Sequence, residues 1–290
     1  MSATPINLLA AAILFAMMTV VGMELTLADF QRVIRRPRAL VAGTLAQLTL
    51  LPAATALLLS VYALPGNMAA GVVLIAAAPG GGISNVFCFL AGSNVALSIA
   101  LTGVSSVVSA ISFPVLAGLG LTYFAGETTA VSLPIPALTG QMLFLVLLPV
   151  CLGMFIRQRS PGLALRYSGP LRRVTFLAII GLIIAALSSD TTGLAGQIVD
   201  GLLAALLWTM MAMALGWLVA RACGLEINDA FTVVIEFSVR NVGLAAIVAL
   251  AVLERPDLAV FFGAYVLVGY PLAGLVSLAY RRINQAGPRE

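Results

Sequence analysis

The residues that could do chemistry gather in two polar interruptions of apolar sequence. The first, residues 78–102, reads APGGGISNVFCFLAGSNVALSIALT and joins a Pro-Gly-Gly-Gly run to small hydroxyl and amide side chains. The second, residues 231–245, reads FTVVIEFSVRNVGLA and carries Glu236, Arg240 and Asn241. Irregular backbone persists at membrane depth only where protein or a water-filled cavity covers it. We therefore expect two broken membrane helices that direct free carbonyl groups and small side chains at a ligand.

Glu236 has the most definite chemical task. A carboxylate at the centre of a bilayer costs roughly 2.5–3.5 kcal/mol on insertion scales, which indicates a partner or a function. One carboxylate among neutral oxygens suits a monovalent cation better than Ca²⁺. The candidate ligands are Ser84, Asn85, Ser98, Thr102 and Glu236. Each hydroxyl taken alone is more typical of helix packing, but the whole set beside the glycine run favours a cation site.

Three further polar residues allow more than one role. Arg240 follows Glu236 by four residues, so the two form an ion pair if the segment is helical there. The guanidinium then only neutralises Glu236, or it replaces a mobile cation or faces an anionic substrate. Asn241 can donate and accept hydrogen bonds at a carboxylate or carbonyl substrate. Gln47 is either a ligand or a hydrogen-bonding partner of a neighbouring helix.

The composition indicates a polytopic helical membrane protein. The chain has 290 residues, of which 61% are hydrophobic and 9% charged, and its mean hydropathy is +1.11. It contains no His, and all its basic residues are Arg, which excludes Ser-His-Asp, His-based metal and Ser-Lys chemistry. Membrane spans with a pair of Asp residues are also absent from the predicted topology. We predict that the protein is not an enzyme and has no cofactor.

Nine segments are long and apolar enough to cross a bilayer. They are about 5–24, 39–62, 67–91, 95–124, 136–156, 171–189, 196–220, 229–253 and 257–280. The third and eighth carry the two interruptions. They run in opposite directions, as an inverted repeat of spans 2–4 and 7–9 requires. Residues 1–290 are predicted to form one integral membrane domain.

The arginines predict the orientation. Thirteen follow odd-numbered spans and so fall on one side, which is cytoplasmic by the positive-inside rule. They are Arg32, Arg35, Arg36, Arg38, Arg157, Arg159, Arg166, Arg172, Arg173, Arg221, Arg281, Arg282 and Arg289. Acidic residues Glu127, Asp190, Asp200, Glu254 and Asp257 fall on the other side. The N-terminus is then outside and the C-terminus inside, and the basic residues mark orientation rather than nucleic-acid binding.

Four pieces of the sequence resemble the bile acid:sodium symporter family, in its bacterial type. They are residues 22–30 (GMELTLADF), 46–53 (AQLTLLPA), 78–106 and 235–246 (IEFSVRNVGLAA). The resemblance implies a core domain, in which the two broken helices cross at mid-membrane, and a panel domain. We assign the core to residues 39–124 and 196–280, and the panel to 5–24, 136–156 and 171–189.

The resemblance also implies the site residues. The first sodium site corresponds to Ser84, Asn85, Ser98, Thr102 and Glu236. The second corresponds to Gln47, Glu236, Phe237, Val239 and Arg240, where Arg240 replaces a Gln of the family. A guanidinium beside Glu236 repels a second sodium ion by several kcal/mol, so we expect one Na⁺ or none. The expected substrate contacts are Gly82, Ile83, Asn241 and Tyr270, the last within a Gly269-Tyr270-Pro271 sequence that departs from the family and reshapes the pocket.

The function predicted on this basis is secondary-active symport of a small organic anion with sodium, by alternating access. For the substrate we expect a keto acid or a pantoate-like metabolite rather than bile acid. The alternative is a proton-coupled or sodium-independent anion carrier or exporter of the same fold, in which Glu236 carries the proton. A channel or signalling protein is the rival from another class. The expected location is a bacterial inner membrane, with lipid as surroundings, no nucleic-acid partner and no obligate protein partner.

Overall fold

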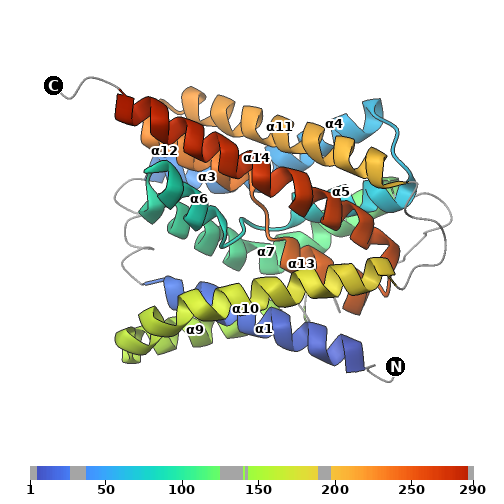
Figure 1. Ribbon diagram of the computed structural model, residues 1–290, viewed down its shortest axis with the longest axis horizontal. Helices are drawn as coiled ribbons and strands as arrows, with labels where there is room; N and C mark the ends of the chain where they lie inside the picture. Colours follow the sequence, from blue (N-terminus) through green and yellow to red (C-terminus); the bar gives the residue numbers. More distant parts are fainter. Residues whose placement is uncertain (1–4, 27–36, 125–139, 141–142, 189–196, 287–290) are drawn as a thin grey trace.

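The structure is a computed structural model that describes residues 5–26, 37–124, 140, 143–188 and 197–286 (Figure 1). These residues are almost entirely helical, which confirms the predicted all-α polytopic class. In the described ranges five helices are long and apolar enough to span a membrane. They are Arg38–Val61, Val95–Phe124, Pro161–Ala185, Val199–Ala222 and Pro256–Asn284. Shorter apolar helices cover Leu8–Glu24, Gly66–Ala77 and Val242–Val252, as expected of interrupted spans.

Three helices form one group along one side of the molecule (Figure 1). They are α1 (Pro5–Glu24), α9 (Leu148–Arg159), which follows a π-helical turn at Leu143–Leu147, and α10 (Pro161–Ser188). Gly22 of α1 and Gly153 of α9 bring the two backbones together, because a Cβ atom at either glycine would meet main-chain atoms of the other helix. Close backbone approach of this kind is how membrane helices gain packing energy without a hydrophobic driving force.

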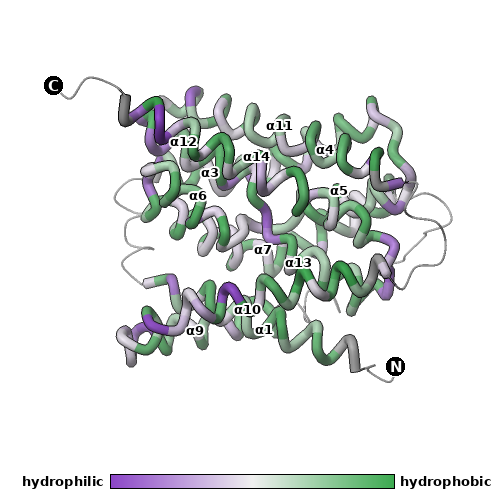
Figure 2. Tube along the Cα trace, viewed as in Figure 1, coloured by the Kyte–Doolittle hydropathy of each residue, from purple (hydrophilic) through white to green (hydrophobic). Residues whose placement is uncertain are grey.

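The remaining helices form a second and larger group. In chain order they are α3 (Pro37–Leu48), α4 (Leu50–Val61), α5 (Gly66–Ala77), α6 (Ser84–Ala91), α7 (Val95–Phe124), α11 (Ile198–Ala222), α12 (Ile227–Ser238), α13 (Val242–Ile247) with its π-helical end η4 (Val248–Val252), the 3₁₀ turn η5 (Pro256–Leu258) and α14 (Ala259–Ala286). Hydrophobic residues cover most of both groups (Figure 2). A hydrophilic segment nevertheless crosses the interior between α12 and α13.

The two predicted interruptions cross each other in the interior. Helix α5 ends where Ala78 turns to extended backbone, and α12 ends where Val239 does the same. The two linkers then pair as an antiparallel bridge between Gly80 and Arg240. The Gly81 N–H donates to the Val239 carbonyl over 2.9 Å, and the Asn241 N–H donates to the Pro79 carbonyl over 2.9 Å. Each break thus satisfies backbone groups that the other leaves free, which is the condition for irregular chain inside a membrane.

Several expected boundaries were wrong. Helix α10 begins at Pro161, ten residues before the predicted 171, and α14 continues to Ala286. The predicted span at 39–62 agrees with the span Arg38–Val61, but its helix is interrupted at Thr49, because Pro52 has no N–H for the Leu48 carbonyl. Parts of the predicted span at 136–156 lie outside the described residues. So do six residues used for the orientation: Arg32, Arg35, Arg36, Glu127, Asp190 and Arg289.

Candidate functional site

The carboxylate of Glu236 lies near the end of α12, fully buried, and its oxygens accept hydrogen bonds from three hydroxyl groups. Ser84 of α6 donates to Oε1. Ser98 of α7 donates to the same oxygen over 2.5 Å. Thr102, one turn further along α7, lies 3.1 Å from Oε1 and 3.0 Å from Oε2. Ser98 and Thr102 share one face of α7 because they are four residues apart, as the spacing predicts.

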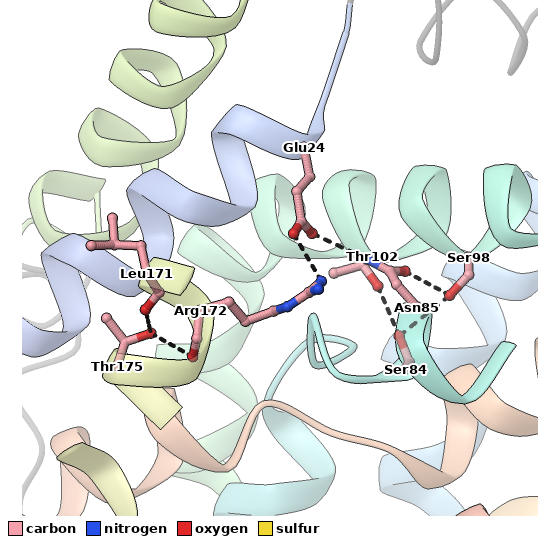
Figure 3. A network of polar contacts seen from close by, with 8 residues as sticks. All are labelled: Glu24, Ser84, Asn85, Ser98, Thr102, Leu171, Arg172 and Thr175. Atoms are coloured by element: carbon pink, nitrogen blue, oxygen red, sulfur yellow. Dashed lines mark hydrogen bonds and ion pairs between the residues drawn. The ribbon is translucent and has the colours of Figure 1, made fainter. Parts of the chain in front are cut away.

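Asn85 completes the cluster and connects it to another part of the molecule (Figure 3). Its side-chain carbonyl oxygen lies 2.8 Å from the hydroxyl oxygen of Ser98. Its amide nitrogen donates to Glu24 Oε2 of α1 over 3.3 Å. The structure therefore brings together all five residues predicted for the first sodium site. The sodium-binding role of these residues stays a prediction.

Arg240 lies outside ion-pair distance of the Glu236 carboxylate in the described chain, because the helical segment on which the expected pair depended ends before Arg240. Helix α12 ends at Ser238, and the extended Val239 turns Arg240 away from the helical face that carries Glu236. The guanidinium instead donates to the backbone carbonyl of Glu236 over 3.2 Å and to that of Ala78. The Glu236 carboxylate is consequently buried among neutral donors.

Two residues of the predicted second site contact the Arg240 guanidinium, Gln47 and the backbone of Glu236. Gln47 of α3 accepts a hydrogen bond of 2.6 Å from Arg240 Nη1 through its side-chain oxygen. Phe237 is fully buried, and the Val239 carbonyl accepts the Gly81 N–H. Arg240 itself is fully buried, and its Nε atom has no hydrogen-bond partner in the part of the chain described. Gln47 is thus a partner of Arg240 in this arrangement.

Two tyrosines of α14 fix the linker around Arg240. The Tyr265 hydroxyl accepts the Arg240 N–H over 2.8 Å and donates to the Ser238 carbonyl over 2.6 Å. The Tyr270 hydroxyl donates to the Arg240 carbonyl over 2.9 Å. Buried backbone groups need such partners once the helical ladder stops. Tyr270 also stacks on Phe176 of α10, so it touches both helix groups.

A cavity of about 740 Å³ lies between the two helix groups, next to the crossing. The four residues predicted to contact substrate all line it: Gly82, Ile83, Asn241 and Tyr270. Gly82 leaves open space where a side chain would be. Asn241 caps α13, since its side-chain oxygen accepts the Leu244 N–H over 3.0 Å. The cavity is the size of typical small-molecule sites.

Sequence reasoning missed the charged residues on the opposite wall of this cavity. Arg157, Arg172 and Arg173 line it, together with one acidic residue, Glu24. Arg172 Nη1 lies 2.8 Å from Glu24 Oε1, a partly buried ion pair (Figure 3). Arg157 Nη1 is buried without a hydrogen-bond partner among the described residues. The available signal was Glu24 itself, the first acidic residue of the chain, at the end of an apolar span.

Comparison with known proteins decides the family. The model of the sodium bile acid symporter family matches residues 11–197. The chain belongs to this family. One relative is the uncharacterized sodium-dependent transporter YocS of Bacillus subtilis, which is 31% identical over 235 residues, or 79% of this chain and 70% of YocS.

Other relatives are less similar to this chain and longer. The probable sodium/metabolite cotransporter BASS1 of Arabidopsis thaliana chloroplasts is 28% identical over 79% of this chain. The human P3 protein is 25% identical over 87% of it. The chain spans about half the length of these two, 55% and 52% respectively. The apolar helices and the family together identify an integral membrane transporter.

Proposed function

We propose that the protein is a secondary-active symporter that moves a small organic anion together with sodium by alternating access. The observation that carries this proposal is the Glu236 carboxylate, fully buried and surrounded by hydroxyl donors without a basic side chain within ion-pair distance in the described chain. A buried charge with no counter-charge within ion-pair distance is costly. A monovalent cation that the hydroxyl oxygens and Asn85 also coordinate would remove that cost.

Sodium would be held by Glu236, Ser84, Asn85, Ser98 and Thr102. Hydroxyl and amide oxygens are the hard ligands that such an ion prefers. The hydroxyl hydrogens now directed at Glu236 would rotate away, because each oxygen keeps lone pairs for a cation. Binding would thus tie α6, α7 and α12 together at the crossing.

Only one sodium ion is proposed, because Arg240 occupies the second position. Its guanidinium already engages the Gln47 side chain and the Ala78 carbonyl, two oxygens that a second cation would use. A fixed positive charge there also repels a mobile one. Arg240 would therefore stand in permanently for the second ion.

The anion is proposed to bind in the cavity beside the crossing. Gly82, Ile83, Asn241 and Tyr270 line one wall and the arginines the other, with apolar side chains such as Met17 and Ile179 between them. Three arginines against one glutamate favour a negatively charged ligand, and guanidinium groups bind carboxylates well. The substrate class that fits is a small carboxylate with an apolar body.

The two helix groups are proposed to be the parts that move: α1, α9 and α10 as panel and the rest as core. The contacts between them include the Asn85–Glu24 hydrogen bond and the Tyr270–Phe176 stack. Because Asn85 is also a proposed sodium ligand, sodium binding would change a contact across this boundary. The proposed location is a bacterial plasma membrane, with the C-terminus and the turn between α9 and α10 in the cytoplasm, the side that the arginines favour.

The test is thermal unfolding of the purified protein with NaCl titrated against choline chloride at constant ionic strength. A ligand that binds only the folded state adds about 1.4 kcal/mol of stability at ten times its Kd. We expect sodium to stabilise the parent and not Glu236→Ala. A matched control, Glu226→Ala, removes an exposed acid at the start of α12 and should keep the sodium response.

The same titration distinguishes a sodium symporter from a proton-coupled or sodium-independent carrier. Absence of a sodium effect in the parent would overturn sodium coupling and favour that carrier. Glu236 would then exchange a proton inside its ring of hydroxyl groups.

A further inference from the structure

A second polar cluster lies between Glu236 and the start of α12. Thr232 precedes Glu236 by one helical turn and is fully buried. Its hydroxyl oxygen accepts the N–H of Asn94 over 3.1 Å and lies 3.2 Å from the hydroxyl oxygen of Ser93. Ser93 and Asn94 form the turn between α6 and α7 and are half-buried. The cluster therefore reaches from the protein surface to a point one turn below the proposed cation site.

Cys88 of α6 joins this cluster to the ligands of Glu236. It is fully buried. It follows Ser84 by one turn of α6, and its backbone carbonyl oxygen accepts a hydrogen bond of 3.3 Å from the Ser93 hydroxyl. Cys88 and Thr232 each lie one helical turn from a residue of the proposed cation site, Ser84 and Glu236 respectively, and each contacts the half-exposed turn. Polar groups are thus continuous along a line where the neighbouring residues of α12, such as Val233 and Ile235, are apolar.

An acidic residue stands at the outer end of this line. Asp229, in the first turn of α12, accepts a hydrogen bond of 2.8 Å from the side-chain amide of Asn94. Within the described ranges no arginine lies within ion-pair distance of Asp229. A carboxylate without an ion-pair partner at the outer end of a line of polar groups raises the local cation concentration and the rate of association.

We propose that these residues form the route by which the coupling cation passes between Glu236 and the side of the membrane that holds the start of α12. We call them the polar column: Asp229, Asn94, Ser93, Thr232 and Cys88. This inference rests on the proposed function, since it needs a cation at Glu236. Oxygen atoms of the polar column would replace water around the ion along the path. Its two fully buried members, Thr232 and Cys88, close the path in the conformation described. An acid at a helix N-terminus also stabilises the helix dipole, but that role does not involve Cys88.

Reaction of Cys88 with methanethiosulfonates tests the column without knowledge of the substrate. The purified double variant Cys151→Ala/Cys223→Ala retains Cys88 as its single thiol. Three reagents of similar reactivity are compared: aminoethyl (cationic), methyl (neutral) and sulfonatoethyl (anionic) methanethiosulfonate. Rates are measured by intact-protein mass spectrometry in choline chloride and in NaCl. Asp229→Asn is then introduced, with Glu226→Gln as its matched control at the same helix end.

We expect the cationic reagent to label Cys88 at least about fivefold faster than the anionic one in choline, because the Asp229 carboxylate lies at the outer end of the column. Sodium should slow this reaction, since an ion at Glu236 lies beside the thiol. Asp229→Asn should lower the ratio of cationic to neutral rates, and Glu226→Gln should leave it unchanged. Equal rates for the three reagents, no reaction at all, or no effect of Asp229→Asn would each overturn the column.

Sodium-dependent thermal stability of the same variants separates the two proposals. If sodium stabilises the protein and the labelling pattern is absent, the column is wrong and the sodium site stands. If sodium stabilises none of the variants with an intact Glu236, the proposed function itself fails, and with it the cation route.

Discussion

At the scale of single residues, the break in α12 separates two opposite charges that stand four positions apart. Glu236 faces hydroxyl groups of α6 and α7, and Arg240 faces Gln47 of α3. The five residues of the predicted first site could be grouped from the sequence because they belong to family motifs, although 152 positions separate Ser84 from Glu236. The Glu24–Arg172 pair could not, because no such motif covers Arg172 and only packing of α1 on α10 brings the two residues together.

Arg240→Gln tests the single-sodium proposal. Removing the guanidinium frees the oxygens of Gln47 and Ala78, and the new side chain adds an oxygen ligand. We expect equilibrium binding of ²²Na⁺ to rise from one ion per protein to two. Arg240→Met removes the charge without supplying an oxygen and should bind fewer ions than Arg240→Gln. The same stoichiometry in the parent and in Arg240→Gln would contradict the proposal.

Tyr265→Phe tests the anchoring of the linker at the same scale. It removes the hydroxyl that serves both the Arg240 N–H and the Ser238 carbonyl. Leaving buried polar groups without partners costs about 1–3 kcal/mol each. We expect a lower thermal unfolding temperature than for Tyr270→Phe, which frees only the Arg240 carbonyl. A larger loss in Tyr270→Phe would show that contacts of the ring of Tyr270 matter more than backbone satisfaction.

At the scale of elements, the glycine run determines how closely α5–α6 approaches α12. A Cβ atom at Gly80 would collide with the Glu236 carboxylate, and one at Gly81 would lie 2.8 Å from the Arg240 carbonyl oxygen. The sequence predicted the break from Pro79 and the glycines, but not which glycine touches what. Element ends were harder to predict, since α10 and α14 continue beyond their apolar runs into charged sequence.

Gly80→Ala and Gly82→Ala form a matched pair that tests this contact. The added methyl group at Gly80 displaces the carboxylate, whereas at Gly82 it meets no atom within 4 Å. We expect Gly80→Ala to lose the stabilisation by sodium and Gly82→Ala to keep it, in the thermal titration described above. If both variants lose the stabilisation by sodium, the glycines are needed for their backbone conformation rather than to leave space for the Glu236 carboxylate.

At the scale of the whole molecule, Glu24 belongs to one helix group and reaches the other through Asn85. It contacts no oxygen of Glu236 in the structure, so its role is predicted to be in the cavity and not in cation binding. Glu24→Ala should therefore retain sodium-dependent stability, measured against the parent in the same buffer. Loss of that response would place Glu24 within the cation site.

The fixed positive charge of the Arg240 guanidinium also affects how much net charge moves in a transport cycle. A fixed charge returns to its starting place in every cycle and so contributes no net current. If one Na⁺ is carried with one monocarboxylate, as proposed, the whole cycle moves no net charge. The membrane potential, worth about 2.3 kcal/mol per moved charge for each 100 mV, then does not contribute to transport. Uptake into vesicles should not respond to a potassium diffusion potential imposed with valinomycin. The sodium concentration ratio alone would limit accumulation of the carboxylate, and its transport would draw no energy from the membrane potential.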